Sequence, residues 1–321
     1  MEIARRGAPR ADGFWGGIAG AGVLPAGPTM RFGFWTCVVA VVCLLGGADP
    51  AFAWGPATHI GLAASVLERL PLLPAAVAAV LARHGIAYLY GNIAADMVFA
   101  KRLSQVKQFC HHWSTAFRLL DAARDDRARA FAYGYLSHLA ADTVAHGKYV
   151  PRQIVLSECS IRFGHFFWEL RADATESDLN WLLLERVLQD DHGYHHEALE
   201  SHFSGTLLPY DVNRLLFDGM NALTVHAKFR RTVDVWNRHS QWYLSDDLMN
   251  GYRAESFDRM HSILAQQARS PLLHEDPNGT SALMHLRVGR REVRRRKRHG
   301  LPVERRLLEA SRALTPSPVN S

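Results

Sequence analysis

The sequence has little cysteine, no obvious β-strand signal and no long apolar run. Only four of its 321 residues are cysteine, which excludes a disulfide framework as the main source of stability. No stretch alternates apolar and polar residues as a half-buried strand does, and neither a G-x-G-x-x-G motif nor a phosphate-binding loop motif occurs. The common nucleotide-binding α/β folds therefore have no support, and no internal repeat suggests a solenoid.

An apolar run near the N-terminus has the features of an export signal. Residues 32–45 follow Arg31 and lead to the small-residue sequence "AFA" at 51–53. A basic residue, a short apolar core and a small-x-small site are typical of a signal peptide, and the run is too short to favour a membrane span. We predict a signal peptide at 30–53, starting at Met30, and a disordered upstream extension at 1–29. Met1 as the true start and an uncleaved anchor are the alternatives.

Cleavage after Ala53 would have three consequences. The protein would be exported, either to the periplasm or out of the cell. Cys37 and Cys43 would be lost, leaving Cys110 and Cys159 able to form one bridge. Trp54 would become the first residue of the mature chain and would carry a free α-amino group.

Charge divides the remainder of the chain into two parts. Residues 287–306 contain ten Lys or Arg and two Glu, whereas residues 54–286 have a net charge of −3. We predict a folded domain at 54–285 and a disordered basic tail at 286–321. Such a tail can contact anionic lipid or nucleic acid electrostatically.

Apolar residues recur at helical spacing through most of the predicted domain. Helices are expected at 58–70, 74–83, 109–123, 127–146 and 161–189, and a short one after the turn residues of "YGNIAADM". The predicted fold class is all-α, a single compact domain of many helices.

Histidine is the informative residue, because two groups of polar side chains follow a helical period. "YLSHLAADTVAH" places His138, Asp142 and His146 at i, i+4 and i+8, and "GHFFWELRAD" repeats the spacing with His165, Glu169 and Asp173. Burying such stripes unpaired is costly, and zinc offsets the cost because it binds imidazole nitrogen and carboxylate oxygen. Further candidate ligands are His59 in "WGPATH", Asp96 in "GNIAAD", and His111 and His112 in "FCHHW".

This ordered set resembles the zinc-dependent phospholipases C over about residues 54–175. Mature chains of that family begin with a Trp whose α-amino nitrogen and carbonyl oxygen bind zinc. The resemblance implies up to three Zn²⁺ ions: one held by Asp96, His111, His138 and Asp142; one by Trp54, His59 and Asp142; and one by His146, His165 and Glu169. His111 is preferred to His112 because the family's ligand often stands two residues before an aromatic, but His112 stays open. Asp173 is expected to orient a ligand histidine.

The function that the resemblance implies is hydrolysis of a phospholipid phosphodiester by zinc-activated water, with Asp96 as general base. Single-strand nucleases share the fold and the zinc cluster, so nucleic acid is an alternative substrate. It is less favoured than phospholipid. A non-catalytic zinc-binding envelope protein is the remaining alternative. "DHGYHHE" at 191–197 is a weaker candidate for a second metal site, because its histidines are expected to face solvent. The sequence gives neither headgroup preference nor oligomeric state.

Overall fold

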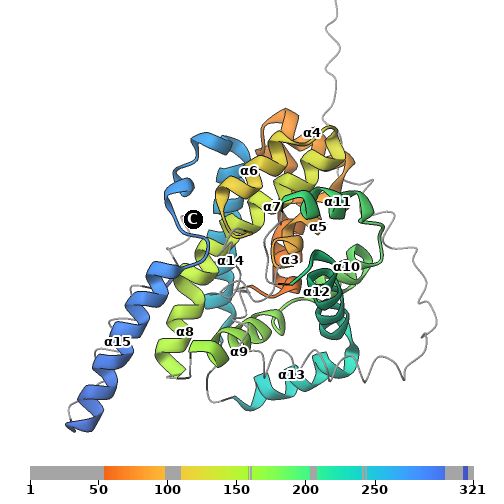
Figure 1. Cartoon of the computed structure of the whole chain (residues 1–321). Helices are drawn as coiled ribbons and strands as arrows, with labels where there is room; N and C mark the ends of the chain where they lie inside the picture. The colour runs from red at the N-terminus through yellow and green to blue at the C-terminus, as the bar shows by residue number, and fades with distance from the viewer. Residues whose placement is uncertain are drawn as a thin grey trace, which may run out of the picture.

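A computed structural model describes residues 54–97, 110–157, 159, 161–202, 208–240, 242, 244–300 and 314–316. The described residues form helices without a β-strand, and this confirms the predicted all-α class (Figure 1). The predicted upstream extension and signal peptide lie outside the described residues.

The described residues contain the following helical elements. In chain order they are α3 (Pro56–Glu68), η1 (Leu70–Leu72), α4 (Ala75–Arg83), α5 (Gly85–Ala94), α6 (Trp113–Asp121), α7 (Asp126–Val144), the π-helical turn η3 (Ala145–Tyr149), α8 (Val150–Ser157), α9 (Ile161–Asp173), α10 (Asp178–Leu188), α11 (Gly193–His202), α12 (Tyr210–Val225), α13 (Ala227–His239), α14 (Asp246–Gln266), η4 (Gln267–Arg269), η5 (Pro271–His274) and α15 (Thr280–Arg298).

Helix α7 is the centre of the fold. Every residue from Ala130 to Val144 is buried, so the helix has no solvent-facing side over these four turns. A helix that is apolar nearly all round belongs inside a bundle. Helices α5, α6 and α14 pack along α7, with α3 against α5. Polar side chains on α7 are therefore held in a dry and rigid environment.

Two glycines let α5 and α7 come into backbone contact. A Cβ atom on Gly91 would lie 2.1 Å from the carbonyl oxygen of Phe131, and one on Gly134 would lie 2.1 Å from that of Tyr88. Both distances are far below van der Waals contact, so only glycine fits at either position. The close crossing brings the carbonyl group of Asn92 within reach of α7.

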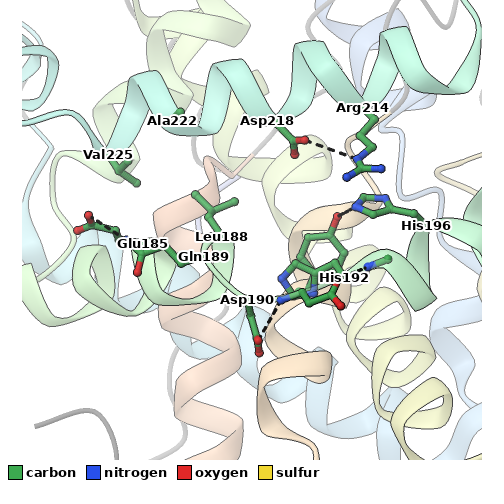
Figure 2. Close-up of a pocket in the computed structure, with 13 residues that line it drawn as sticks. Glu185, Leu188, Gln189, Asp190, His192, His196, Arg214, Asp218, Ala222 and Val225 are labelled. Carbon is green, nitrogen blue, oxygen red and sulfur yellow. Dashed lines mark hydrogen bonds and ion pairs between the residues drawn. The ribbon is translucent and has the colours of Figure 1, made fainter. Parts of the chain in front are cut away.

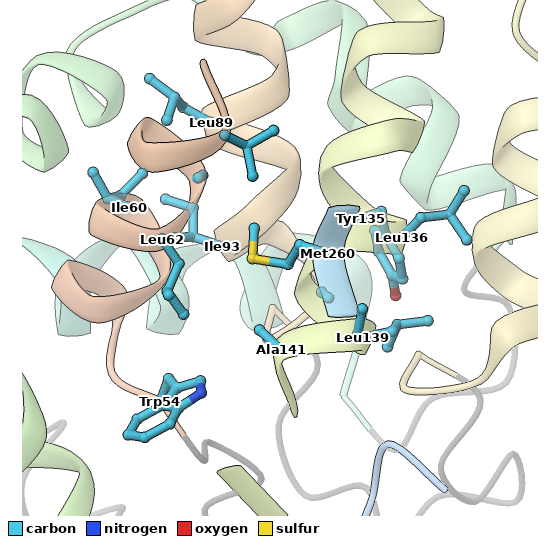
Figure 3. Close-up of a cluster of buried hydrophobic side chains, with 14 of the residues drawn as sticks. Trp54, Ile60, Leu62, Leu89, Ile93, Tyr135, Leu136, Leu139, Ala141 and Met260 are labelled. Carbon is cyan, nitrogen blue, oxygen red and sulfur yellow. The ribbon is translucent and has the colours of Figure 1, made fainter. Parts of the chain in front are cut away.

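The hydrophobic core joins α3, α5, α7 and α14 (Figure 3). Trp54, just before α3, is fully buried and stacks on Tyr149 of the π-helical turn, with ring centroids 4.6 Å apart. Large aromatic side chains contribute much of the energy of such a core. The start of α3 is thereby fixed to the end of α7. Other core residues drawn in Figure 3 are Ile60, Leu62, Leu89, Ile93, Tyr135, Leu136, Leu139, Ala141 and Met260.

Two helix predictions differ from the structure. The turn expected at Tyr90–Asn92 is wrong, because these residues lie inside α5, where the contact at Gly91 outweighs the turn preference of Gly and Asn. The single helix expected at 161–189 is two helices. Ser177 begins the second one by accepting a hydrogen bond from the amide of Asn180.

Residues 286–298, in the region where a disordered tail is expected, form the larger part of α15, which ends at Arg298. Arginine and lysine are good helix formers, and Leu286 is buried near the start of the helix, where α15 contacts α8 and the π-helical turn. Residues 301–313 and 317–321 of the tail are not among the described residues. None of the described helices combines the length and apolar character needed to cross a membrane.

The glycine contact between α5 and α7 can be tested by adding one methyl group. Gly134→Ala should lower the free energy of unfolding by about 1–3 kcal/mol or more, because the neighbouring carbonyl group belongs to a backbone that cannot rotate away. Gly147→Ala is the matched control, since a Cβ there meets nothing within 4 Å. Denaturant unfolding of both variants measures the difference, and equal stability would contradict the close crossing.

Candidate metal centre

Helix α7 and the turn after it present three polar side chains on one buried face. His138 and Asp142 are fully buried, and His146, on the π-helical turn, is nearly so. π-helical turns inside long helices are frequent at functional sites. The sequence spacing thus places one buried imidazole on each side of a buried carboxylate.

Asp142 is the hub of this arrangement. Its Oδ1 atom lies 3.3 Å from Nε2 of His59, which is on α3. Its Oδ2 atom lies 3.2 Å from Nε2 of His111 and 3.1 Å from Nε2 of His138. His146 Nε2 is slightly farther from the same oxygen, at 3.6 Å. One carboxylate therefore faces four imidazole rings.

A second carboxylate, Asp96, approaches from the end of α5. Its Oδ1 atom lies 3.0 Å from Nε2 of His111 and 3.9 Å from Nε2 of His138. His111 is fully buried among these groups. His112, in contrast, is exposed and caps α6, its ring accepting a hydrogen bond from the amide of Ser114. Of the two adjacent histidines, only His111 thus faces the carboxylates.

A backbone contact fixes the tautomer of His138 and so determines which ring nitrogen can bind a metal ion. Nδ1 lies 2.7 Å from the carbonyl oxygen of Asn92, which can only accept, so Nδ1 carries the proton. In the neutral ring Nε2 then presents a lone pair, and it points at Nε2 of His111, 3.1 Å away. A backbone carbonyl that fixes the tautomer of a histidine is typical of metal ligands.

The donor atoms are close enough to share a cation. His111, His138 and Asp142 offer ligand atoms within 4.8 Å of one another, and so do His59, Asp96 and His138. Among the described residues, the ring nitrogens of His59 and the carboxylate oxygens of Asp142 are buried without a hydrogen bond of regular geometry, although the two side chains lie close together. Imidazole nitrogen with carboxylate oxygen is a donor set that fits zinc. The buried polar groups thus have the composition and spacing of a metal centre.

A third group of predicted ligands lies next to this cluster. Glu169 Oε1 is 3.7 Å from Nδ1 of His165, one turn earlier on α9. The rings of His165 and His146 have centroids 5.4 Å apart. All three side chains are buried. The second sequence stripe therefore meets the first through His146.

Burial governs the protonation of the centre. It lowers the pKa of His146 to about 3 and, with the neighbouring His138, lowers the pKa of His59. Burial alone would raise the pKa of Asp142, but the surrounding histidines hold it well below its usual value. At neutral pH His59 and His146 are thus neutral imidazoles beside the ionised carboxylate of Asp142, and these are the protonation states that bind metal.

Asp173 has a different role from the one expected. Its carboxylate accepts hydrogen bonds from the amides of Ala57 and Thr58, at 3.2 and 2.9 Å, and from the Thr58 hydroxyl at 2.7 Å. Burial raises its pKa to about 7, while the bonds from Thr58 oppose the rise. Instead of orienting a histidine, Asp173 caps the start of α3. A Cβ atom on Gly55 would lie 2.3 Å from the same carboxylate, so glycine permits this contact.

Sequence reasoning missed a segment that supports two of the ligands. Asn278 donates a hydrogen bond of 2.8 Å to the carbonyl group of His111. Gly279 has a φ of +60°, and a Cβ there would lie 2.5 Å from the carbonyl oxygen of His146. The signal was present as the turn-forming "DPNG" at 276–279, but its neighbours in space could not be read from the sequence.

The expectation that the histidines of "DHGYHHE" face solvent is wrong. His192, His195 and His196 are buried at the start of α11, where the ring of His192 stacks on Tyr90 of α5 with centroids 3.5 Å apart and that of His195 stacks on Phe131 of α7. His192 and His196 line a cavity of about 490 Å³ that Arg214 and Asp218 of α12 also line (Figure 2). In the described part of the chain, the groups with metal-binding spacing do not include these histidines.

A smaller cavity of about 40 Å³ adjoins the third ligand group. Glu169 lines it together with Gly55 and Asp173, and the remaining wall is mostly apolar. The apolar contributors come from α9 and α12: Phe166, Leu170, Phe217 and Met220. The cavity beside these ligands is thus lined by carboxylate groups on one side and by apolar side chains on the other.

Comparison with known proteins gives one match. Residues 58–206 match the family model described as zinc dependent phospholipase C. The matched range contains every predicted ligand except Trp54, which lies four residues before it. No curated protein and no solved structure matches the chain.

The cap on α3 yields a prediction about stability. Asp173→Ala should lower the free energy of unfolding by on the order of 3 kcal/mol, because three buried donors lose their acceptor. Asp173→Asn keeps an acceptor oxygen and should lose less. Amide hydrogen exchange at Ala57 and Thr58 is the specific readout, and unchanged exchange there in Asp173→Ala would contradict the capping role.

Proposed function

Because residues 58–206 belong to the zinc-dependent phospholipase C family, we propose that this chain is an exported zinc-dependent phosphodiesterase that hydrolyses a phospholipid. The observation that carries the proposal is the buried convergence of histidines on Asp142, whose two oxygens face imidazoles from three separate segments. A purely structural role would not require so many ionisable groups in one dry place.

The residues would divide the metal ions as follows. Asp96, His111, His138 and Asp142 would hold one zinc, and His146, His165 and Glu169 another. His59 and Asp142 would hold a third together with the backbone of Trp54. The donor set supports this division, since it contains nitrogen and oxygen ligands only. Zinc held there would supply Lewis acidity towards a phosphodiester and a nucleophilic water at neutral pH.

Residues of the chain have separate tasks in the proposed reaction. Asp96, with one oxygen 3.0 Å from His111, would accept a proton from the attacking water. The contact between His138 and the carbonyl of Asn92 would keep Nε2 directed into the centre. Exclusion of bulk water by the core around α7 strengthens every electrostatic interaction in the site.

The choice of lipid over nucleic acid is supported by the family match, because the model that residues 58–206 match is described as a zinc dependent phospholipase C. The cavity beside Glu169, at about 40 Å³, is too small to hold an acyl chain and favours neither substrate. A single-strand nuclease with the same ligands is the alternative substrate class. A non-catalytic zinc protein is the other alternative, and it is less favoured because structural zinc sites are typically closed and cysteine-rich.

Export and cleavage after Ala53 belong to the same proposal. Trp54 is anchored between Tyr149 and Tyr252, with ring centroids 4.6 and 6.4 Å away. This anchor, with the Asp173 cap one turn later, would hold a new amino terminus in a fixed place. N-terminal sequencing of the protein recovered from the periplasm or medium tests the point, and a fully active protein that retains residues before Trp54 would contradict it.

Two adjacent histidines provide a matched pair for testing the metal centre. His111→Ala should lose at least one zinc per chain, because His111 Nε2 faces both Asp96 and Asp142. His112→Ala should keep its full zinc content and lose about 1 kcal/mol at most, the value of a helix cap. Elemental analysis of both purified variants decides the assignment, and the reverse result would make His112 the ligand.

The central carboxylate links zinc binding to activity. Asp142→Asn should lose zinc and reduce kcat/KM on phosphatidylcholine by at least about 100-fold, since the amide weakens contacts with several ligands at once. Asp121→Asn, at the exposed end of α6, is the control. The same preparations are assayed on single-stranded DNA. Turnover of DNA alone would establish the nuclease alternative, and inactivity on both with zinc bound would favour the non-catalytic one.

A further inference from the structure

Helix α15 differs from the rest of the molecule in position and in charge. It extends away from the helical body over most of its length (Figure 1). It contains eight Lys or Arg and one Glu, a net charge of +7 over 19 residues. It lies outside the range matched by the family, so the family resemblance assigns it nothing.

Four arginines of α15 share one face. Arg287, Arg291, Arg294 and Arg298 are all exposed and follow the spacing i, i+4, i+7 and i+11. At 3.6 residues per turn they lie within about 60° of one another and span about 16 Å. Met284, one turn before Arg287, is 62% exposed and extends the same face. These five residues are the arginine stripe.

We propose that the arginine stripe binds the anionic headgroups of a lipid bilayer, with α15 lying along the surface. Guanidinium groups pair with phosphate through two parallel hydrogen bonds, and a row of them matches a plane of phosphates. Each basic side chain near an anionic bilayer adds to binding, and an exposed methionine can enter the headgroup region.

The stripe is joined directly to the candidate metal centre. Helix α15 starts at Thr280, next to Gly279, which packs against the backbone of His146. Asn278, one residue earlier, bonds to the carbonyl of His111. A bilayer bound along α15 would therefore meet the protein beside its ligands. This consequence rests on the proposed phospholipid substrate, whereas the binding itself does not.

Lipid is favoured over nucleic acid by the composition of the stripe. A nucleic-acid backbone offers phosphates but no apolar layer for an exposed methionine. A bilayer offers phosphate groups at its surface and an apolar layer directly beneath them. Single-stranded DNA is the competing polyanion, and the test must include it.

The experiment measures binding of the full mature chain to vesicles of phosphatidylcholine alone or mixed with phosphatidylglycerol, at low and high salt. The stripe variant replaces its four arginines: Arg287→Gln, Arg291→Gln, Arg294→Gln and Arg298→Gln. The control variant removes the same charge from exposed positions in four separate segments: Arg124→Gln, Arg186→Gln, Lys228→Gln and Arg269→Gln. Glutamine keeps helix propensity close to that of arginine. Circular dichroism checks that both variants remain folded.

The wild-type chain should bind the mixed vesicles in a salt-sensitive way, and the stripe variant should lose at least about 100-fold in partition coefficient. The control variant should lose less than about threefold, because scattered charges do not act together. Hydrolysis of a short-chain, monomeric phosphatidylcholine should be unchanged in the stripe variant, which separates this proposal from the catalytic one.

Three results would overturn the proposal. These are equal binding to neutral and mixed vesicles, an equal loss in the control variant, and binding of single-stranded DNA without binding of mixed vesicles. If the stripe binds vesicles but no phospholipid is hydrolysed, the lipid surface stands and the proposed reaction fails.

Discussion

The structure depends on the burial of one ionised carboxylate, Asp142, inside the central helix. A lone carboxylate there would be strongly unfavourable. The protein meets this cost by surrounding it with imidazoles from α3, α7 and the segment before α6, which hold its pKa low. Removing the water that would otherwise solvate the group also makes the site responsive to a cation.

This electrostatic arrangement requires close packing. Backbone contact at Gly91 and Gly134 places the carbonyl of Asn92 where it can fix the ring of His138. Tertiary contacts from the other end of the chain complete the support, through Asn278 and Gly279. Geometry at the ligands is thus set by neighbours that carry no metal-binding chemistry themselves.

The sequence was sufficient where a local period determines the outcome. The i, i+4, i+8 spacing of His138, Asp142 and His146 directly predicts a shared helical face, and the structure places them on one. Packing across distant segments was not visible. No local signal showed that Asp173 would cap α3, 115 residues away, because either role suits a buried carboxylate.

Adjacent residues were the hardest to separate. His111 and His112 differ by one position, and only the fold shows which ring turns inward. The histidines at 192–196 appeared exposed because turn residues surround them, yet stacking on Tyr90 buries them. In each of these cases a contact that is remote in sequence outweighed the local pattern.

The π-helical turn at Ala145–Tyr149 sets the rotational phase of everything after α7. Such a turn holds one more residue than an ordinary helical turn. Loss of a single residue there would rotate α8 by about 100° relative to α7. Tyr149 would then no longer stack on the indole of Trp54. The ligands on α3 and those that follow α7 would lose their present alignment. The lineage of this fold should therefore tolerate insertions in its surface loops far more readily than a deletion at this point.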